Sequence, residues 1–181
     1  MTGSVALRSV TPQDVSAVRE IYAHHVLHGT GTFELTAPDE AEMAARIDAV
    51  TATGLPFLVA TQGVDVLGFA YAGPYRPRPA YRFTVEDSIY LRADATGRGI
   101  GAVLLREVLD RCEGLGVRQV IAVIGDTANV ASIRTHEKCG FATIGTFRAV
   151  GWKFGRWLDT VLMQRELGAG AGTSPELTLN P

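Results

Sequence analysis

The sequence predicts an α/β fold, more narrowly α+β, in which helices pack on a mixed sheet. Segments with apolar residues at helical spacing alternate with short β-rich segments in the order β-α-α-β-β-β-α-β-α-β-β. Two neighbouring β-rich segments are separated by a short polar turn, which predicts an antiparallel hairpin. Residues 117–124 form a nearly continuous β-branched run, which is typical of a buried central strand. This order does not fit a doubly wound parallel sheet.

Length and composition indicate an ordinary globular protein. The chain has 181 residues, of which 46% are hydrophobic and 20% charged, and its formal net charge is -2. So small a net charge gives no reason to expect nucleic acid or an acidic membrane as a partner. Two cysteines are too few for a disulfide framework, so we expect a reducing, cytoplasmic setting. The N-terminus lacks the pattern of a secretion signal, and no apolar run is long enough to cross a bilayer.

The chain is expected to form a single domain over residues 1–167, followed by a flexible tail over residues 168–181. The tail is rich in Gly, Ala, Ser and Pro, which gives it little apolar surface to bury. Packing of this tail on a partner subunit is the alternative.

The first half of the chain predicts a strand, two helices and the hairpin. Residues 4–10 alternate loosely and predict a strand. The Thr-Pro pair at 11–12 suits the N-cap and first position of a helix. A second helix is expected near residues 39–53. Residues 56–75 predict the hairpin, with its turn at residues 62–65.

The second half predicts two long helices separated by strands. The first helix is expected to stop at Gly114 or Gly116, and the second to close on Gly140. The expected elements are a strand at 83–91, a helix at 97–116, a strand at 117–124, a helix at 129–140, and strands at 141–150 and 157–167.

A glycine-rich loop directly precedes the first of these helices. In the stretch TGRGIG, Gly97, Gly99 and Gly101 fall within five residues. Glycines lack the Cβ atom that would hold an anion away from backbone amides, and a helix N-terminus favours negative charge. The loop therefore predicts an anion site formed by the amides of Gly97 to Ala102, with the charge of Arg98 beside it.

Several interpretations of this loop compete. A P-loop is excluded because no Lys-Ser or Lys-Thr pair occurs in the chain. The dinucleotide pattern G-x-G-x-x-A is matched by Gly97, Gly99 and Ala102, but the loop lies mid-chain and no acidic residue ends the next strand. The third interpretation is that the amides of the loop bind the pyrophosphate of coenzyme A, and the anion site fits it. The alternative that this is only a glycine-rich turn at the start of a helix stays open.

The wider sequence resembles the GNAT superfamily of N-acetyltransferases. The resemblance rests on a strand, the glycine loop, a long helix, a buried strand, and a helix containing Asn-x-x-Ser that is followed by GF. In that family the motif R/Q-x-x-G-x-G/A binds the pyrophosphate of acetyl-CoA. Here TGRGIG fills the motif, with Thr96 in place of the Arg or Gln. The resemblance implies a GNAT fold with a mixed, mostly antiparallel central sheet flanked by helices, and acetyl-CoA as co-substrate.

Three longer segments resemble the phosphinothricin or methionine sulfoximine acetyltransferases. They are GFAYAGPYRPRPAYRFTVEDSIYL, VIGDTANVASIRTHEKCGF and FRAVGWKFGRWLDTVLMQREL, and the likeness covers roughly residues 5–167. It implies acetylation of the α-amine of a small amino-acid analogue: phosphinothricin, methionine sulfoximine or methionine sulfone. It also implies a homodimer whose pocket lies near the subunit interface. Direct transfer in a ternary complex is the simplest mechanism.

Glu86 is the candidate general base. Strand alternation over residues 83–91 places Glu86, Ser88 and Tyr90 on one face. A mid-strand carboxylate suits the deprotonation of an α-amine whose pKa is near 8. From the residues alone a solvated glutamate is the alternative, and the resemblance points to the base. Asp87 falls on the apolar side of the pattern, where we expect it to cap a neighbouring turn or sit at a bulge.

Other groups complete the expected chemistry. The resemblance places His136 where related enzymes have a histidine proposed to assist proton transfer, and a structural histidine is the alternative. Tyr90 or water is expected to protonate the leaving thiolate. A backbone amide near Leu91 is expected to polarise the thioester carbonyl.

Asn129 stands where the family contacts the pantetheine arm or phosphates, and it suits a helix N-cap equally well. The expected acetyl-CoA contacts come from the strand end, the glycine loop and the second helix. They are Ile89, Tyr90, Leu91, Gly97, Arg98, Gly99, Ile100, Gly101, Ala102, Asn129 and Ser132.

The loop PYRPRPAYRF supplies the candidate grip on the amine substrate. Arginine binds carboxylate and phosphinate in bidentate fashion, and prolines stiffen the loop. The resemblance implies that Arg76 and Arg78 bind the acidic end of the substrate, with Tyr81 as a wall and Phe33 lining the pocket. A solvated basic loop and a core Phe33 are the alternatives.

No metal site is expected, because His24 and His28 lie one helical turn apart without an evident third ligand. Two rival functions remain. One is a GNAT enzyme that acetylates a protein or peptide amine, and the other is a non-catalytic coenzyme-binding module.

Overall fold

The computed structural model describes residues 4–175 as four helices and seven strands. The strands are β1 (Ala6–Ser9), β2 (Phe57–Gln62), β3 (Asp65–Pro74), β4 (Thr84–Leu91), β5 (Gln119–Gly125), β6 (Ala142–Lys153) and β7 (Arg156–Glu166). The helices are α1 (Val15–His28), α2 (Glu40–Ala52), α3 (Ile100–Gly114) and α4 (Val130–Lys138).

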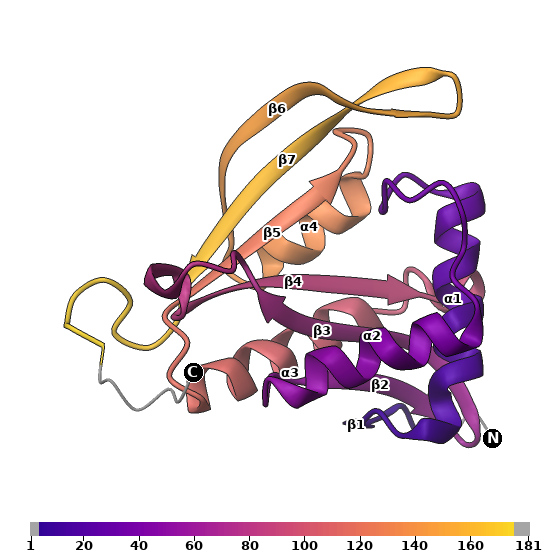
Figure 1. Cartoon of the computed structure of the whole chain (residues 1–181), viewed down its shortest axis with the longest axis horizontal. Helices are drawn as coiled ribbons and strands as arrows, with labels where there is room; N and C mark the ends of the chain where they lie inside the picture. Colours follow the sequence, from indigo (N-terminus) through magenta and orange to yellow (C-terminus); the bar gives the residue numbers. More distant parts are fainter. Residues whose placement is uncertain (1–3, 176–181) are drawn as a thin grey trace.

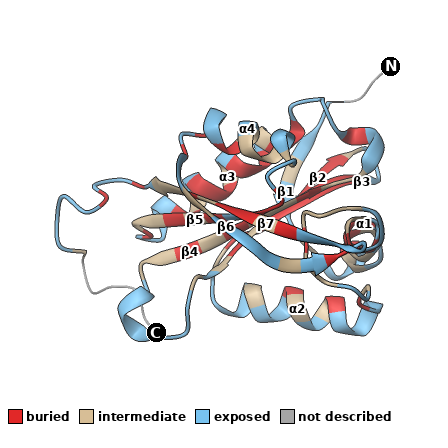
Figure 2. Ribbon diagram, turned by 90° about the horizontal axis from the view of Figure 1, so that it is seen from above, coloured by how far each residue is buried: buried red, intermediate tan, exposed pale blue. Residues whose placement is uncertain are grey.

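The strands form one mixed sheet in the order β1-β2-β3-β4-β5-β7-β6. Neighbouring strands run antiparallel except for β4 and β5, which are parallel and connected through α3. Figures 1 and 2 show α1 and α2 on one face of the sheet and α3 and α4 on the other. The predicted mixed, mostly antiparallel sheet flanked by helices is confirmed.

A hydrophobic core lies on each face of the sheet. On the α3 face, Leu104, Leu105 and Leu109 are fully buried together with residues of β2 to β5. On the α1 and α2 face, Val18 and Phe69 belong to a second cluster. Because both faces are covered, the central strands are buried on both sides, as Figure 2 shows in red.

The start of the first helix differs from the expectation. Residues 12–14 form a 3₁₀ turn, and α1 begins only at Val15. The backbone N–H and the hydroxyl of Thr11 both donate to Asp14 Oδ2 at 2.8 Å, and Arg8 forms an ion pair with the same carboxylate. The hydrogen bond from Arg8, with those from Thr11, lowers the pKa of Asp14 to about 2. The Thr-Pro pair therefore caps a short turn that leads into the helix.

Strand β6 is longer than expected, and β7 begins and ends one residue earlier than expected. β6 runs to Lys153 and β7 starts at Arg156. The gap expected at residues 151–156 is therefore reduced to a tight hairpin turn at Phe154 and Gly155. Both turn residues have positive φ angles, of 53° and 71°. Gly155 serves this turn, and Gly151 permits a close packing contact with Phe33.

Strands β4 and β5 pair over the first half of β4 and then diverge. Their pairing runs from Thr84 opposite Gln119 to Asp87 opposite Ala122, whereas the strands continue to Leu91 and Gly125. Beyond Asp87 the edge of β4 that faces β5 has no strand partner there. The sheet is therefore open between the two strands, at the C-terminal end of each.

The segment after residue 167 forms turns over residues 168–173. The side chain of Arg118 donates to the Thr173 hydroxyl at 3.3 Å. Residues 176–181, the rest of the predicted tail, lie outside the described residues, so the flexibility of this tail stays a prediction.

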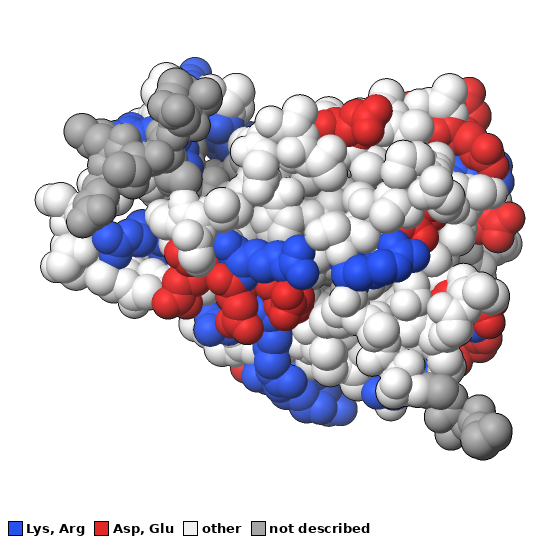
Figure 3. All heavy atoms as spheres, turned by 90° about the horizontal axis from the view of Figure 1, so that it is seen from below, with Lys and Arg blue, Asp and Glu red and all other residues white. Residues whose placement is uncertain are grey.

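The surface carries acidic and basic side chains in mixture. Figure 3 shows both signs interspersed on one face of the molecule, in keeping with the net charge of -2. Within the described part of the chain, no helix is long and apolar enough to span a membrane.

Candidate functional site

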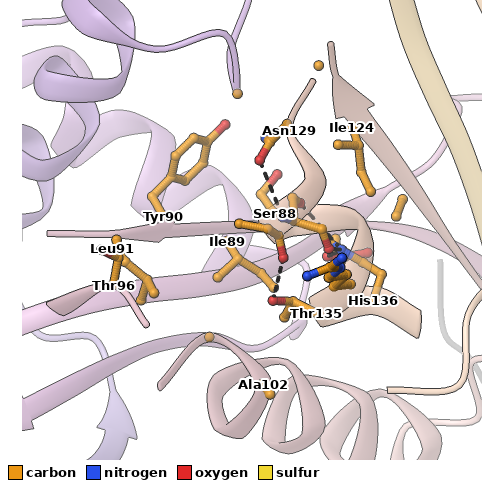
Figure 4. Close-up of a pocket in the computed structure, with 18 of the residues that line it drawn as sticks. Ser88, Ile89, Tyr90, Leu91, Thr96, Ala102, Ile124, Asn129, Thr135 and His136 are labelled. Carbon is orange, nitrogen blue, oxygen red and sulfur yellow. Dashed lines mark hydrogen bonds and ion pairs between the residues drawn. The ribbon is translucent and has the colours of Figure 1, made fainter. Parts of the chain in front are cut away.

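A cavity of about 530 Å³ lies where β4 and β5 part. Its walls come from residues 87–91 of β4, the glycine loop, residues 122–125 at the end of β5, and α4, with His25 and Gly31 at one side. Figure 4 shows Asn129, Ile124 and His136 across the cavity from Leu91 and Thr96. The cavity therefore joins the strand end, the loop and the second helix that the sequence singled out.

The glycine loop forms one wall of this cavity. Gly97 and Gly99 have φ angles of 73° and 78°, a left-handed conformation that suits glycine, and Gly99 directly precedes α3. A Cβ atom at either position would meet nothing within 4 Å, so backbone conformation and not crowding calls for glycine here. The loop and the helix N-terminus can together hold an anion. Arg98, by contrast, donates to Gln62 at 3.2 Å and is not part of the cavity wall.

Asn129 and Ser132 line the opposite wall at the start of α4. The side-chain oxygen of Asn129 accepts a hydrogen bond from the Ser132 N–H at 3.3 Å, which makes Asn129 the N-cap of α4. The capping alternative for Asn129 is therefore confirmed. Capping leaves the Asn129 amide group at the edge of the cavity, so it is compatible with a ligand contact.

Glu86 lies on the α1 and α2 face of β4 and is partly buried. Burial raises its pKa, the charge of Asp87 raises it further, and the charge of Arg76 lowers it. Glu86 is not part of the cavity wall that contains the glycine loop. The structure therefore places the two main predicted groups on opposite faces of β4, with the open edge of the strand between them.

Asp87 occupies neither a turn cap nor a bulge, so that expectation is wrong. It sits in regular register, opposite Ala72 on β3 and Ala122 on β5, and its side chain is only 2% exposed. Its Oδ2 lies 3.0 Å from Nε2 of His136, whose side chain is 5% exposed. A carboxylate on the apolar face of a strand was the signal in the sequence, but only the fold brings a histidine to meet it.

His136 is held at both ring nitrogens. Nδ1 lies 2.8 Å from the carbonyl oxygen of Ser132, which can only accept, so Nδ1 carries a proton. Nε2 faces the carboxylate of Asp87. Burial works against a charged ring, but the hydrogen bond and the charge of Asp87 outweigh it and raise the pKa of His136. The pair ties α4 to β4 at the point where the strands part.

The end of β4 is fixed from the α1 side. Figure 4 shows the Tyr90 ring on the opposite side of the β4 ribbon from Ile89. The Tyr90 ring contacts the rings of Tyr22 and His25 at centroid distances of 5.0 and 5.4 Å, and burial raises its pKa well above the ordinary value. His25, which sequence reasoning missed, donates from Nε2 to the carbonyl oxygen of Leu91 at 2.8 Å.

A polar cluster lies beside Tyr90 on the same face of the sheet. The Tyr22 hydroxyl donates to Glu34 at 2.9 Å and lies 3.0 Å from the Thr32 hydroxyl. Arg46 forms an ion pair with Glu34 at 2.7 Å. Burial raises the pKa of Tyr22 to about 12. This cluster is absent from the sequence predictions, because its members come from α1, α2 and the loop between them.

The predicted substrate residues are dispersed. Arg76, Arg78 and Tyr81 are exposed in the loop between β3 and β4, and only Arg76 influences Glu86 electrostatically. The Arg76 guanidinium lies over the Tyr75 ring at 5.1 Å. Phe33 packs against Gly125 and Gly151 instead of standing in the cavity wall. Within residues 4–175 no group of three or more His, Cys, Asp or Glu residues is arranged to hold a metal ion.

A cleft between parting parallel strands, with a glycine loop and a helix N-terminus at one wall, suits a coenzyme with a pyrophosphate and a long acyl arm. Residues 19–141 match the family model described as "Acetyltransferase (GNAT) family". The chain belongs to the GNAT acetyltransferases.

More specific likenesses narrow the family. The chain is 53% identical over 170 residues to the phosphinothricin N-acetyltransferase of Alcaligenes faecalis, covering 94% of this chain and 86% of that protein. It is 38% identical to the L-methionine sulfoximine/L-methionine sulfone acetyltransferase of Pseudomonas paraeruginosa, covering 91% of this chain and 95% of that one.

A crystal structure points the same way. The GNAT superfamily phosphinothricin acetyltransferase of Sinorhizobium meliloti, in complex with AcCoA, matches with a TM-score of 0.94 and 48% identity. The match covers 100% of this chain and 97% of that one. The chain is therefore an acetyl-CoA-dependent N-acetyltransferase of the phosphinothricin and methionine sulfoximine acetyltransferase family, and its fold is the GNAT fold.

Proposed function

We propose that this enzyme acetylates the α-amine of phosphinothricin, methionine sulfoximine or methionine sulfone by direct transfer from acetyl-CoA in a ternary complex. The observation that carries the proposal is the arrangement around β4. The glycine loop and its cleft lie on one side of the strand, and Glu86 with the nearby charge of Arg76 lies on the other. The names of the relatives agree with it.

The amides of Gly97 to Ala102 would bind the pyrophosphate of acetyl-CoA, with Arg98 nearby at the outer end. The acyl arm would follow the unpaired edge of Ile89, Tyr90 and Leu91 opposite Asn129 and Ser132. A backbone amide near Leu91 would polarise the thioester carbonyl. The free strand edge supports this role, because its polar groups find no strand partner beyond Asp87.

Glu86 would act as the general base. Within the described residues its carboxylate has no hydrogen bond or ion pair, and its raised pKa makes it a better proton acceptor than an ordinary glutamate. Arg76 would bind the acidic group of the substrate close to this base. Arg78, Tyr81 and Phe33 would complete the pocket.

Two groups are candidates for protonating the leaving thiolate. Tyr90 stays protonated at neutral pH because burial raises its pKa. His136 could deliver a proton to the thiolate only by giving up a hydrogen bond, since both of its ring nitrogens are engaged. The geometry therefore favours Tyr90 or water as the donor.

We also propose a homodimer in the cytoplasm. Large apolar side chains on the β6–β7 hairpin are more than half exposed, and an apolar surface of this kind suits a protein partner. They are Ile144, Phe147, Val150, Trp152, Phe154 and Trp157. The family resemblance suggests that a second copy of the chain covers this surface. Sedimentation of the wild-type enzyme and of Trp157→Ser tests this, and the variant is expected to associate less.

The test is a thiol-release assay with acetyl-CoA against a panel of amines. Phosphinothricin, methionine sulfoximine and methionine sulfone are compared with ordinary amino acids and with peptides. Arg76→Ala is expected to raise KM for phosphinothricin, whose phosphinate is anionic, more than for methionine sulfone, whose side chain is uncharged. Activity on peptides with none on the analogues would contradict the substrate class. Acetyl-CoA binding without turnover on any amine would point to a binding module.

A further inference from the structure

Lys153 is a buried cation that the proposed chemistry does not use. It ends β6, is 3% exposed, and its Nζ donates to the carbonyl oxygens of Gly29 and Thr32, both at 2.8 Å. Within residues 4–175 no carboxylate lies within ion-pair distance of it. Burial lowers its pKa. Because a buried ammonium is costly without strong partners, the two carbonyls are an essential part of its environment.

The loop that Lys153 holds, residues 29–34, is packed closely on two strands. At Gly125, the end of β5, an added Cβ atom would collide with the carbonyl oxygen of Thr30. At Gly151 on β6 it would collide with the ring of Phe33. These are independent observations that the loop must approach both strands, and Figure 1 shows the indigo loop after α1 reaching toward the end of β5.

The same loop reaches the candidate site. Gly31 lines the cavity. The Thr32 hydroxyl meets the Tyr22 hydroxyl, whose ring contacts Tyr90. Tyr22 also donates to Glu34, which follows the loop tip. The conformation of residues 29–34 therefore sets the position of the polar cluster beside β4, on the face that carries Glu86.

We propose that Lys153 is a positioning residue for the amine substrate: by drawing the carbonyls of Gly29 and Thr32 onto one ammonium group, it closes the 29–34 loop into a wall of the amine pocket. The inference rests on the proposed function for the identity of that pocket. Lys153 itself touches no reacting group. Without it, two carbonyls would face buried space unsatisfied, and the loop would open away from β5 and β6 to hydrate them.

The decisive variant is Lys153→Met, which keeps the length of the side chain and removes the donor. Both substrates are varied in steady-state assays, with whichever amine the wild-type enzyme acetylates best. KM for the amine is expected to rise at least about tenfold, the equivalent of about 1.4 kcal/mol, while KM for acetyl-CoA changes less than about twofold. Arg148→Met is the matched control, because Arg148 lies on the same strand with its side chain 82% exposed.

A second variant tests the loop from the other side. Gly151→Ala forces Phe33 to move and is expected to raise KM for the amine in the same way. In the double variant the two effects should be less than additive, because each releases the same loop. Hydrogen exchange of residues 29–35 should be faster in Lys153→Met than in the wild-type enzyme, and this readout needs no turnover.

Three outcomes would overturn the inference. They are unchanged exchange in residues 29–35, a lower unfolding temperature with both KM values unaltered, and a rise confined to KM for acetyl-CoA. If Lys153→Met does not fold, Gly151→Ala, which disturbs the same loop from β6, provides the comparison. A wild-type enzyme that acetylates only peptides would contradict the substrate class, whereas the exchange result would still decide the role of Lys153.

Discussion

Glu86 and Asp87 are adjacent acidic residues on β4 with opposite environments. Glu86 points toward the α1 and α2 face, is partly buried and has no hydrogen bond or ion pair within the described residues. Asp87 points toward the α3 and α4 face, where it is buried against His136. One residue along a strand reverses the face. Two like carboxylates on one strand therefore have different environments, because each face of the strand packs against different elements.

The substitution Glu86→Gln should have the largest effect, a loss of catalytic activity. Loss of the base should reduce kcat/KM by about 10²- to 10⁴-fold, the usual contribution of general base catalysis. The free energy of unfolding should change by no more than about 0.5 kcal/mol, because the side chain has no structural partner. Thiol release and urea unfolding measure the two quantities. A loss of activity below about threefold would contradict the role of Glu86.

Asp87→Ala should have the opposite effect to Glu86→Gln: its main consequence should be a loss of stability. It leaves the charge of His136 buried without a partner, which costs about 3–5 kcal/mol when one member of a buried pair is removed. The measurement is urea unfolding, with Asp87→Asn as the variant that keeps the shape. A double-mutant cycle with His136→Leu isolates the pair. A stability loss of less than about 1 kcal/mol would show that the pair does not hold α4 on β4.

The pair should also give stability a pH dependence of defined sign. The pKa of His136 in the folded protein is raised above its unfolded value of about 6.5. Its contribution is therefore fully present below about pH 6.5 and is lost as pH rises through the folded pKa. Unfolding of wild type and His136→Gln is compared at pH 6 and pH 9, and the difference should be larger at pH 6. An equal difference at both values would mean that the ring is neutral in the folded protein.

The smallest effect concerns the pH profile of Glu86. The charge of Arg76 lowers its pKa, so Arg76→Met should raise that pKa further and move the acid limb of kcat/KM to higher pH. This shift should shrink at high salt because Arg76 is exposed. Arg82→Met, in which the removed cation lies over Phe83, is the control. If the acid limb of the kcat/KM profile did not move, the proposed influence of Arg76 on the pKa of Glu86 would be contradicted.

Much of this site follows from local sequence. The glycines at the start of α3, the cap at Asn129 and the alternation that separates Glu86 from Asp87 are short-range features, and each is found where the sequence predicts it. Local rules work here because they concern the backbone conformation of a few neighbouring residues.

Other features depend on residues far apart in the chain. Asp87 meets His136 across 49 positions, and Lys153 meets Thr32 across 121. The cavity exists because β4 and β5 stop pairing after Asp87 and Ala122, which no single segment encodes.

The sequence by itself determined which segments are helices and strands, where the glycine loop lies, and the family to which the enzyme belongs. Only the tertiary structure decided which buried charges meet and how the loop after α1 closes on β5 and β6. The physical reason is range. Side-chain periodicity and turn chemistry act over a few residues, whereas the partner of a buried charge is set by how whole elements pack.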